Sequence, residues 1–433
     1  MHTKKHLSFS ALRKSLSSHF RQVDDSRQQG KIEFEMHDCL MSGFAMMLFQ
    51  DPSLCAFQRR IEDIYQRSNL HSMFEVRNIP KDSQMRDLLD TINPESLEPI
   101  FSDFLGQIQR GRHLEKYQVL GGKYLIPIDG SEYFSSNKIS CPSCLTQKKK
   151  GSVRYHHNIV QAVIVHPDMP QVLPLAPEAV TNKDGAKKQD CEINAGKRLL
   201  TKIRKAHPKL PIIISGDGLY SKHPFIQECK KRNFSYIFVA KPLDHKVLFE
   251  YVEEITAIGE AQILEFVDLK HRRHIYRWIN QVPVNGDSKA EDVNFFSYQI
   301  VIKNKETYQN SWITDIPIDS KNIIELVKSG RCRWKIENET FNTLKNQGYH
   351  IEHNYGHGAQ NLSMIFFLLN LLAFFVHQIL DLTDALYQRL RYEKFTSRKE
   401  FWNQLRCTFR ILLFRNWEHM FTYLLNPPPL QPP

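Results

Sequence analysis

The sequence predicts an α/β fold: a mixed sheet with flanking helices, a β-rich insertion and a helical N-terminal region. Three observations predict it. Apolar clusters recur at helical spacing before residue 115, apolar runs typical of strands begin near residue 120, and strand-like and helical segments then alternate. A strand meander followed by alternating helices and strands is typical of a mixed sheet covered by helices.

Residues 1–115 are expected to form the helical N-terminal region. Apolar residues recur at helical spacing in CLMSGFAMMLF (39–49) and FSDFLGQI (101–108). In IPKDSQMRDLLDTI (79–92), Asp82 or Ser83 can cap the start of another helix.

The first part of the sheet is expected within 116–242, in the order βββαβαβ. Strands are predicted over 122–129, 157–168, 171–180, 210–218 and 234–242, and helices over 189–206 and 221–232.

A β-rich insertion is expected over 243–318, where short strand-like runs are split by NGDSKAED (285–292). The last part of the core follows over 319–381. A C-terminal helical region and a Pro-rich tail are expected over 382–433.

The segment 361–380, NLSMIFFLLNLLAFFVHQIL, is long and apolar enough to span a membrane. It also carries Asn361, Asn370 and Gln378, and we identify no second segment of this kind. We therefore expect a buried core helix, with a membrane-anchored protein as the alternative.

The composition indicates a soluble protein with a polyanionic partner. The 433 residues are 41% hydrophobic and 24% charged, and the net charge is +11. Nucleic acid is the commonest polyanion, although a basic soluble protein without one has the same composition. Eight scattered cysteines and a basic N-terminus without an apolar run favour a reducing, cytoplasmic compartment.

Two aspartates follow predicted strands. Asp129 ends the first strand, in PIDGSE, and Asp217 follows the fourth, in ISGDGLYS. Functional groups gather at the carboxyl ends of strands in such sheets, and the glycine after each Asp allows a tight turn. The common alternative for an Asp-Gly pair is a simple turn.

Glu337 lies in RCRWKIENETFNTLKNQGYH (331–350), which has the pattern of an amphipathic helix. At 100° per residue, it falls in one arc with Trp334, Phe341 and Leu344. An unpaired buried carboxylate is costly, so we expect a metal ion or Arg333, one turn earlier, to compensate it.

Carboxylate clusters of this kind suit a hard cation such as Mg²⁺. Two such ions about 3.5–4 Å apart can activate the attacking oxygen and stabilise the leaving oxygen in phosphoryl transfer.

With this order of elements and acids, the chain resembles the bacterial cut-and-paste insertion-sequence transposases of the DDE type. The resemblance spans roughly 35–380. It is most specific in RWKIENETFNTLKNQGYHIEHNYGHG (333–358), with weaker support from DPSLCAF (51–57) and IPKDSQMRDLLD (79–90). It implies a ribonuclease-H-like core in which Asp129, Asp217 and Glu337 are catalytic ligands of Mg²⁺, for which Mn²⁺ can substitute.

The residues around the acid follow the family pattern only in part. The family often has Tyr, Arg and Lys there, and Arg333 occupies the Arg position. Gly330 stands at the Tyr position and Leu344 at the Lys position, with Lys345 one residue further. Arg333 and Lys345 are therefore the expected DNA contacts near Glu337.

The resemblance also implies an aromatic residue in the insertion that stacks on a flipped base. Trp278 is the candidate, beside Arg272, Arg273 and Arg277. The alternative is a strand tryptophan in a local core.

A Cys/His group follows the first strand. CPSC places Cys141 and Cys144 before His156 and His157, a set that can hold Zn²⁺. With a single CxxC, the sequence favours the alternative of a reduced cysteine pair in a loop.

The expected function is DNA transposition: cleavage at the terminal inverted repeats and transfer of the 3′-hydroxyl into double-stranded target DNA. We expect a homodimer on DNA, a cytoplasmic, nucleoid-associated location, no membrane association, and DNA-end binding by the N-terminal helices. The alternatives are a metal-dependent nuclease of the same fold without strand joining and a non-catalytic DNA-binding protein.

Overall fold

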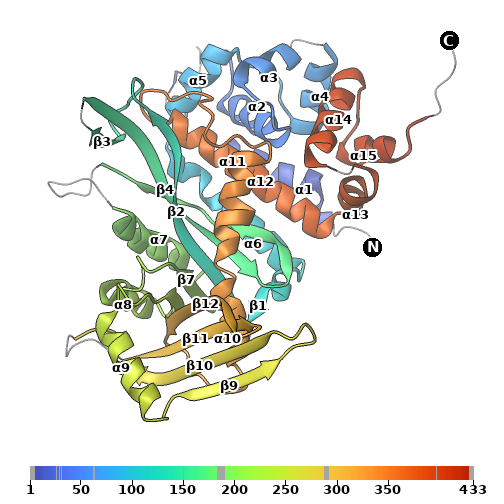
Figure 1. Ribbon diagram of the computed structural model, residues 1–433. Coiled ribbons are helices and arrows are strands. Elements are labelled where there is room, and N and C mark those ends of the chain that lie inside the picture. Colours follow the sequence, from blue (N-terminus) through green and yellow to red (C-terminus); the bar gives the residue numbers. More distant parts are fainter. Residues whose placement is uncertain are drawn as a thin grey trace.

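The computed structural model describes residues 5–428 except 26, 29, 31, 62, 63, 150, 183–190, 287–291 and 396. One large mixed sheet runs through the molecule, and a layer of helices from both ends of the chain lies beside it (Figure 1). The predicted α/β fold with a helical N-terminal region is confirmed.

The sheet has the strand order β3-β4-β2-β7-β8-β12-β11-β10-β9. Its first part comprises β1 (Gln118–Val119), β2 (Lys123–Ser136), β3 (Leu145–Lys149), β4 (Ser152–His166), β5 (Met169–Pro174), β6 (Glu178–Val180), β7 (Ile212–Gly216) and β8 (Ser235–Val239). Strands β2, β7 and β8 are parallel, and β4 runs antiparallel to β2. The predicted third strand, 171–180, is split into β5 and β6, which both pair with β4.

The insertion continues this sheet. It contains α9 (Lys246–Ala257), β9 (Gln262–Val267), β10 (Arg273–Val282), β11 (Val293–Ile302) and β12 (Lys305–Thr314). Strand β12 pairs antiparallel with β8, which joins the inserted strands to the core. The sequence interpretation missed β12 and also missed α9, whose buried Leu248 and Val252 have helical spacing.

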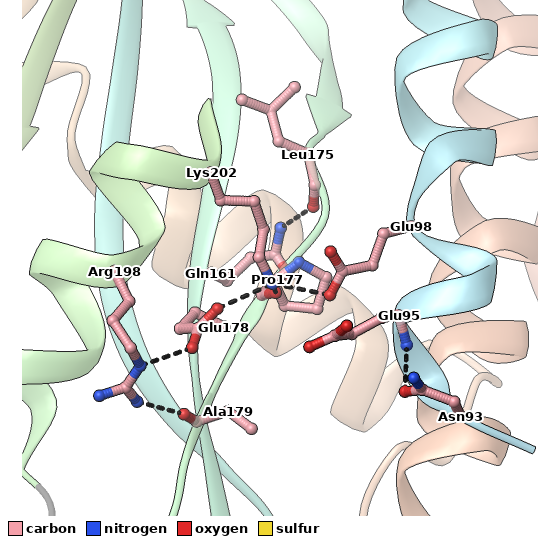
Figure 2. Close-up of polar contacts among 10 residues, drawn as sticks. All are labelled: Asn93, Glu95, Glu98, Gln161, Leu175, Pro177, Glu178, Ala179, Arg198 and Lys202. Carbon is pink, nitrogen blue, oxygen red and sulfur yellow. Dashed lines mark hydrogen bonds and ion pairs between the residues drawn. The ribbon is translucent and has the colours of Figure 1, made fainter. Parts of the chain in front are cut away.

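Helices α7 (Glu192–Ala206) and α8 (His223–Lys231) lie to the left of β2 and β4 in Figure 1, and α12 (Leu362–Thr383) lies to the right. Polar contacts fix α7 in place (Figure 2). Lys202 pairs with Glu98 and Glu178, each at 2.7 Å, and Arg198 pairs with Glu178 at 2.7 Å. These contacts tie α7 to both β6 and the N-terminal helices.

The helical layer comes from both chain ends. Its N-terminal part comprises η1 (Lys5–Leu7), α1 (Phe9–Phe20), α2 (Met36–Leu48), α3 (Leu54–Ile61), α4 (Ile64–Phe74), α5 (Asp82–Asp90), η3 (Pro94–Leu97), α6 (Pro99–Arg110) and η4 (Leu114–Tyr117). The C-terminal part comprises α13 (Ala385–Arg389), η6 (Leu390–Lys394), α14 (Arg398–Ile411) and α15 (Trp417–Leu425). Phe9 stacks on Trp417 at 4.1 Å between ring centroids, so the two parts share one core. The predicted cap at Asp82 or Ser83 was wrong, because the cap residue is Lys81.

The apolar helix α12 is mostly buried inside the protein, as expected. In its most apolar 18-residue window, 89% of the residues are buried. Its polar side chains bind neighbouring segments: Asn370 Nδ2 donates to the carbonyl of Tyr349 at 2.7 Å, and Gln378 Oε1 accepts from the amide of Val172 at 2.9 Å. Burial and internal hydrogen bonds are typical of a core helix.

Candidate active site

Asp129 lies on β2, and Asp217 directly follows β7, the parallel strand beside it. The parallel strands β2 and β7 pair Tyr124 with Ile212 and Pro127 with Ser215. The same register, carried two residues further, places Asp129 level with Asp217. Two carboxylates therefore stand together where β7 ends.

The expectation that Asp129 ends its strand was wrong. β2 continues to Ser136, because it still pairs with β4 after β7 has ended at Gly216. The PIDGSE sequence resembles a turn, and the pairing that keeps it extended comes from a distant strand.

Arg333 joins Asp129 to Glu337. Its guanidinium lies 3.6 Å from a carboxylate oxygen of Asp129 and 2.7 Å from one of Glu337. The structure thus brings Glu337 to the carboxyl end of β7, where Asp129 and Asp217 lie.

The prediction of a buried Glu337 was wrong. Its side chain is 51% exposed, and Trp334, expected in the same buried arc, is 43% exposed, while Phe341 and Leu344 are buried as expected. The segment is not one continuous α-helix: α10 (Ile323–Arg331) ends in a turn before Trp334, and η5 (Ile336–Asn342), a π-helix, precedes α11 (Thr343–Asn346). Hydrogen bonds from i to i+5 rotate side chains away from the phase of 100° per residue, and π-turns are frequent at functional sites.

Lys335 anchors this segment to the sheet. Its side chain is buried, and Nζ donates to the carbonyls of His166, Pro167 and Met169 at 2.8, 3.2 and 2.6 Å. A buried ammonium ion needs such partners. Lys335 therefore fixes the start of the π-helix against the β4–β5 turn.

Asp129 is the acid of this site whose ionisation is most affected by its surroundings. Burial raises the pKa of Asp129 to about 7; Arg333 opposes the rise, and the charges of Glu337, Glu192 and Asp217 add to it. A carboxyl group with such a pKa among other acids is typical of a site that binds a cation.

Glu192 is an acid that the sequence interpretation missed. It lies in the first turn of α7 and accepts a hydrogen bond from the Tyr220 hydroxyl at 2.8 Å. A Cβ atom at Gly130 would overlap its carboxylate, so Gly130 permits the close approach. Burial raises the pKa of Glu192, and the hydrogen bond from Tyr220 opposes this rise. The signal available in the sequence was an acidic residue in the first turn of the helix that lies between the strands of Asp129 and Asp217.

The departures from the family pattern have a packing reason. A Cβ atom at Gly330 would lie 2.8 Å from the ring of Trp312, so no larger side chain fits there in this arrangement. Leu344 is fully buried. Lys345, the expected substitute, pairs with Glu352 at 2.7 Å.

The insertion does not present Trp278 to solvent. This side chain is 5% exposed and lies in the sheet core, so the prediction of a base-stacking ring is corrected to the core alternative. Arg272 pairs with Asp268 at 2.6 Å and Arg273 with Glu265 at 2.5 Å. Arg277 Nε is buried. Trp334, which follows Arg333 in the chain, is exposed instead.

The Cys/His group forms, with one change of ligand. Cys141, Cys144 and His157 come together, and His357 completes the cluster. His156 is not part of it, because neighbouring residues on a strand point to opposite faces.

Two family models match the chain. A family model described as Transposase DDE domain matches residues 136–375, more than half of the chain. The chain belongs to the DDE transposase family. A second model, described as DDE_Tnp_1-associated, matches residues 17–105.

The DDE domain match includes Asp217 and Glu337 and begins after Asp129, so the link to Asp129 rests on the sheet register and on Arg333. No curated protein matches the chain. Membership makes the chain a DNA-processing protein of the transposase type, a class that uses divalent metal ions.

Proposed function

We propose that this DDE transposase cleaves DNA at the ends of its own element and transfers the free 3′-hydroxyl into target DNA. The convergence of Asp129 on β2, Asp217 directly after β7 and Glu337 on a π-helix carries the proposal. Phosphoryl transfer requires charge neutralisation and positioning at one point, and these three carboxylates would supply the ligands for both.

The donor set fits Mg²⁺, with Mn²⁺ as a substitute. All three side chains offer carboxylate oxygens, the ligands that hard cations prefer. Burial raises the pKa of Asp129, the neighbouring acids add to the rise, and a bound cation would favour the ionised form. Asp129, Asp217 and Glu337 would hold the ions, which activate the attacking oxygen and stabilise the leaving oxygen.

The protein orients the acids before any ligand binds. Asp129 Oδ1 accepts from the amide of Gly130 at 3.0 Å, and Asp217 Oδ1 accepts from the amide of Leu219 at 2.9 Å. Arg333 holds Glu337 near Asp129 and can turn toward a DNA phosphate once cations replace it. Lys345 is a second phosphate contact if its pair with Glu352 opens.

The proposed partners are double-stranded DNA with terminal inverted repeats, target DNA and a second copy of the chain. The net charge of +11 favours DNA. Residues 1–115 would bind the ends, 116–242 and 319–381 would form the catalytic core around the 243–318 insertion, and 382–433 would support the helical layer. A cytoplasmic location at the nucleoid follows from this substrate.

The test is a cleavage and strand-transfer assay with paired DNA ends taken from the sequence that borders the gene. With Mg²⁺, the wild type should give cleaved and joined products. Asp129→Asn, Asp217→Asn and Glu337→Gln should each lose at least about a thousandfold in rate, since each removes a charged metal ligand. Glu339→Gln, two residues along the same π-helix, is the matched control and should stay active.

Three results would contradict parts of this proposal. Cleavage without joined product would favour the nuclease alternative. Binding without cleavage in any divalent metal would favour the non-catalytic alternative. Unchanged cleavage in all three acid variants would refute the catalytic assignment.

A further inference from the structure

Four side chains from three distant segments meet beside the β2–β4 hairpin. Cys141 and Cys144 lie in the loop between β2 and β3, His157 lies on β4, and His357 lies in the loop that leads into α12. Their ligand atoms all lie within 4.8 Å of one another. Cys144, His157 and His357 are buried, and Cys141 is partly exposed.

The spacing of these atoms is that of a tetrahedral metal site. The two sulfurs are 3.8 Å apart, and the two histidine Nε2 atoms are 3.1 Å apart. The sulfur–Nε2 distances are 3.5 Å for Cys141–His157, 3.4 Å for Cys144–His157 and 3.5 Å for Cys144–His357. Bonds of about 2.3 Å to sulfur and 2.0–2.1 Å to nitrogen require about 3.8, 3.4 and 3.6 Å for the S–S, N–N and S–N separations.

The surroundings orient the ligands. His357 Nδ1 lies 3.1 Å from the carbonyl of Gly358, a hydrogen bond that leaves Nε2 free to bind a metal. The backbone amide of Cys141 donates to Cys144 Sγ at 3.4 Å. The Asn182 side-chain amide donates to the carbonyls of Pro142 and Cys144. Outer hydrogen bonds of this kind are typical of metal-binding loops.

Aromatic rings enclose the inner side of the cluster. The ring of Phe134 lies 4.3 Å from that of His357, and the ring of Tyr133 stacks on His157 at 5.7 Å. Both belong to β2, so the strand that carries Asp129 also packs against the cluster.

We propose that Cys141, Cys144, His157 and His357 bind one structural Zn²⁺ ion. Two thiols would lose their protons on binding, and the four protein ligands would fill every tetrahedral position. A site of this kind has no open position for a substrate, so its role is structural. Two sulfurs and two imidazoles favour zinc over the oxygen-preferring Mg²⁺ of the carboxylate site.

The ion would connect the two halves of the candidate active site. The CxxC loop follows β2, and His157 lies on β4, where these two paired strands extend beyond Asp129. His357 lies in the loop that follows the Glu337 segment. Zinc would therefore hold the segment after the π-helix against the extension of β2. The proposal does not depend on transposase activity.

Metal analysis of the purified full-length chain, prepared without chelator or added Mg²⁺, tests the proposal. The wild type should contain about one zinc ion per chain, as a closed four-ligand site requires. Cys144→Ser and His357→Asn should lose most of it. His156→Asn is the matched control: it removes the neighbouring histidine and should keep the zinc.

A second measurement avoids variants that fail to fold. Wild-type protein stripped of metal and titrated with Co²⁺ should develop the absorption of tetrahedral cobalt bound to thiolates, and Zn²⁺ should displace it. Wild type that contains no zinc and gives no such absorption would overturn the proposal, as would iron in place of zinc. Zinc lost by His156→Asn but kept by His357→Asn would overturn the ligand set.

Discussion

At the residue scale, the three acids could be chosen from sequence, but their environments could not. Asp129 and Asp217 follow recognisable strands, and Glu337 lies in a family-like segment. Glu192 was missed because its relation to Asp129 depends on how α7 docks on the sheet, with Gly130 leaving room for the carboxylate. In the same way, His357 could not be chosen over His156, because it lies 200 residues from His157 in the chain.

The raised pKa of Asp129 predicts a pH dependence of metal binding. The carboxyl group must be ionised to hold a cation, and its pKa is about 7. Apparent Mg²⁺ affinity should therefore weaken about tenfold from pH 8 to pH 6, in proportion to the ionised fraction. Metal titration of the cleavage rate at several pH values measures this dependence. A constant affinity across the range would argue against the role of Asp129.

Glu192→Gln should shift the pH at which Mg²⁺ affinity falls. Removing one neighbouring negative charge lowers the pKa of Asp129, so the loss of Mg²⁺ affinity should begin at a lower pH than in the wild type. The same titrations measure the shift. Glu339→Gln, which alters an acid outside the group of neighbours that mainly set this pKa, should leave the profile in place.

The same carboxyl group affects the stability of the metal-free protein. Its folded-state pKa is higher than its ordinary value of 3.8, so the folded chain binds more protons than the unfolded chain between about pH 4 and pH 7. Its contribution to stability therefore falls as the pH rises through that window.

At the element scale, strands and helices of the core could be predicted, whereas the π-helix could not. Local apolar patterns predict β7 and β8, because both strands are short runs of buried, mostly apolar residues. A π-turn leaves no comparable pattern. Lys335, which looks like a surface residue in the sequence, instead becomes a buried anchor through the carbonyls of the β4–β5 turn.

Trp334 is exposed beside Arg333, just before the π-helix, and this predicts a DNA contact. An exposed tryptophan ring one residue from Arg333 can stack on an unpaired base of the bound DNA. Trp334→Ala should weaken binding of single-stranded or nicked end DNA by about tenfold, whereas Trp334→Phe should keep most of it. Fluorescence anisotropy with labelled DNA measures the change. Equal affinity in wild type and Trp334→Ala would contradict the stacking role.

At the scale of the whole molecule, the two chain ends form one helical layer that sequence patterns cannot reveal. Asn69, buried on α4, donates to the carbonyls of Phe409 and Leu412 at 2.8 and 2.6 Å. Its Oδ1 accepts from the amide of Phe414 at 2.8 Å. These partners lie about 340 residues away in the chain. Residues 1–115 and 382–433 lie at opposite ends of the sequence, while their packing makes them one unit.

Asn69→Leu should therefore destabilise the protein far more than its place in the N-terminal region suggests. It leaves two carbonyls and one amide of the C-terminal segment without their partner, at a cost of about 3 kcal/mol or more. Ser72→Ala is the control: Ser72 is an exposed residue whose hydroxyl donates to the carbonyl of Phe414. Water can replace this hydroxyl, so the change should stay within about 0.5 kcal/mol. Denaturant unfolding of both variants measures the difference. Equal stability of Asn69→Leu and wild type would mean that the two chain ends are not joined through this residue.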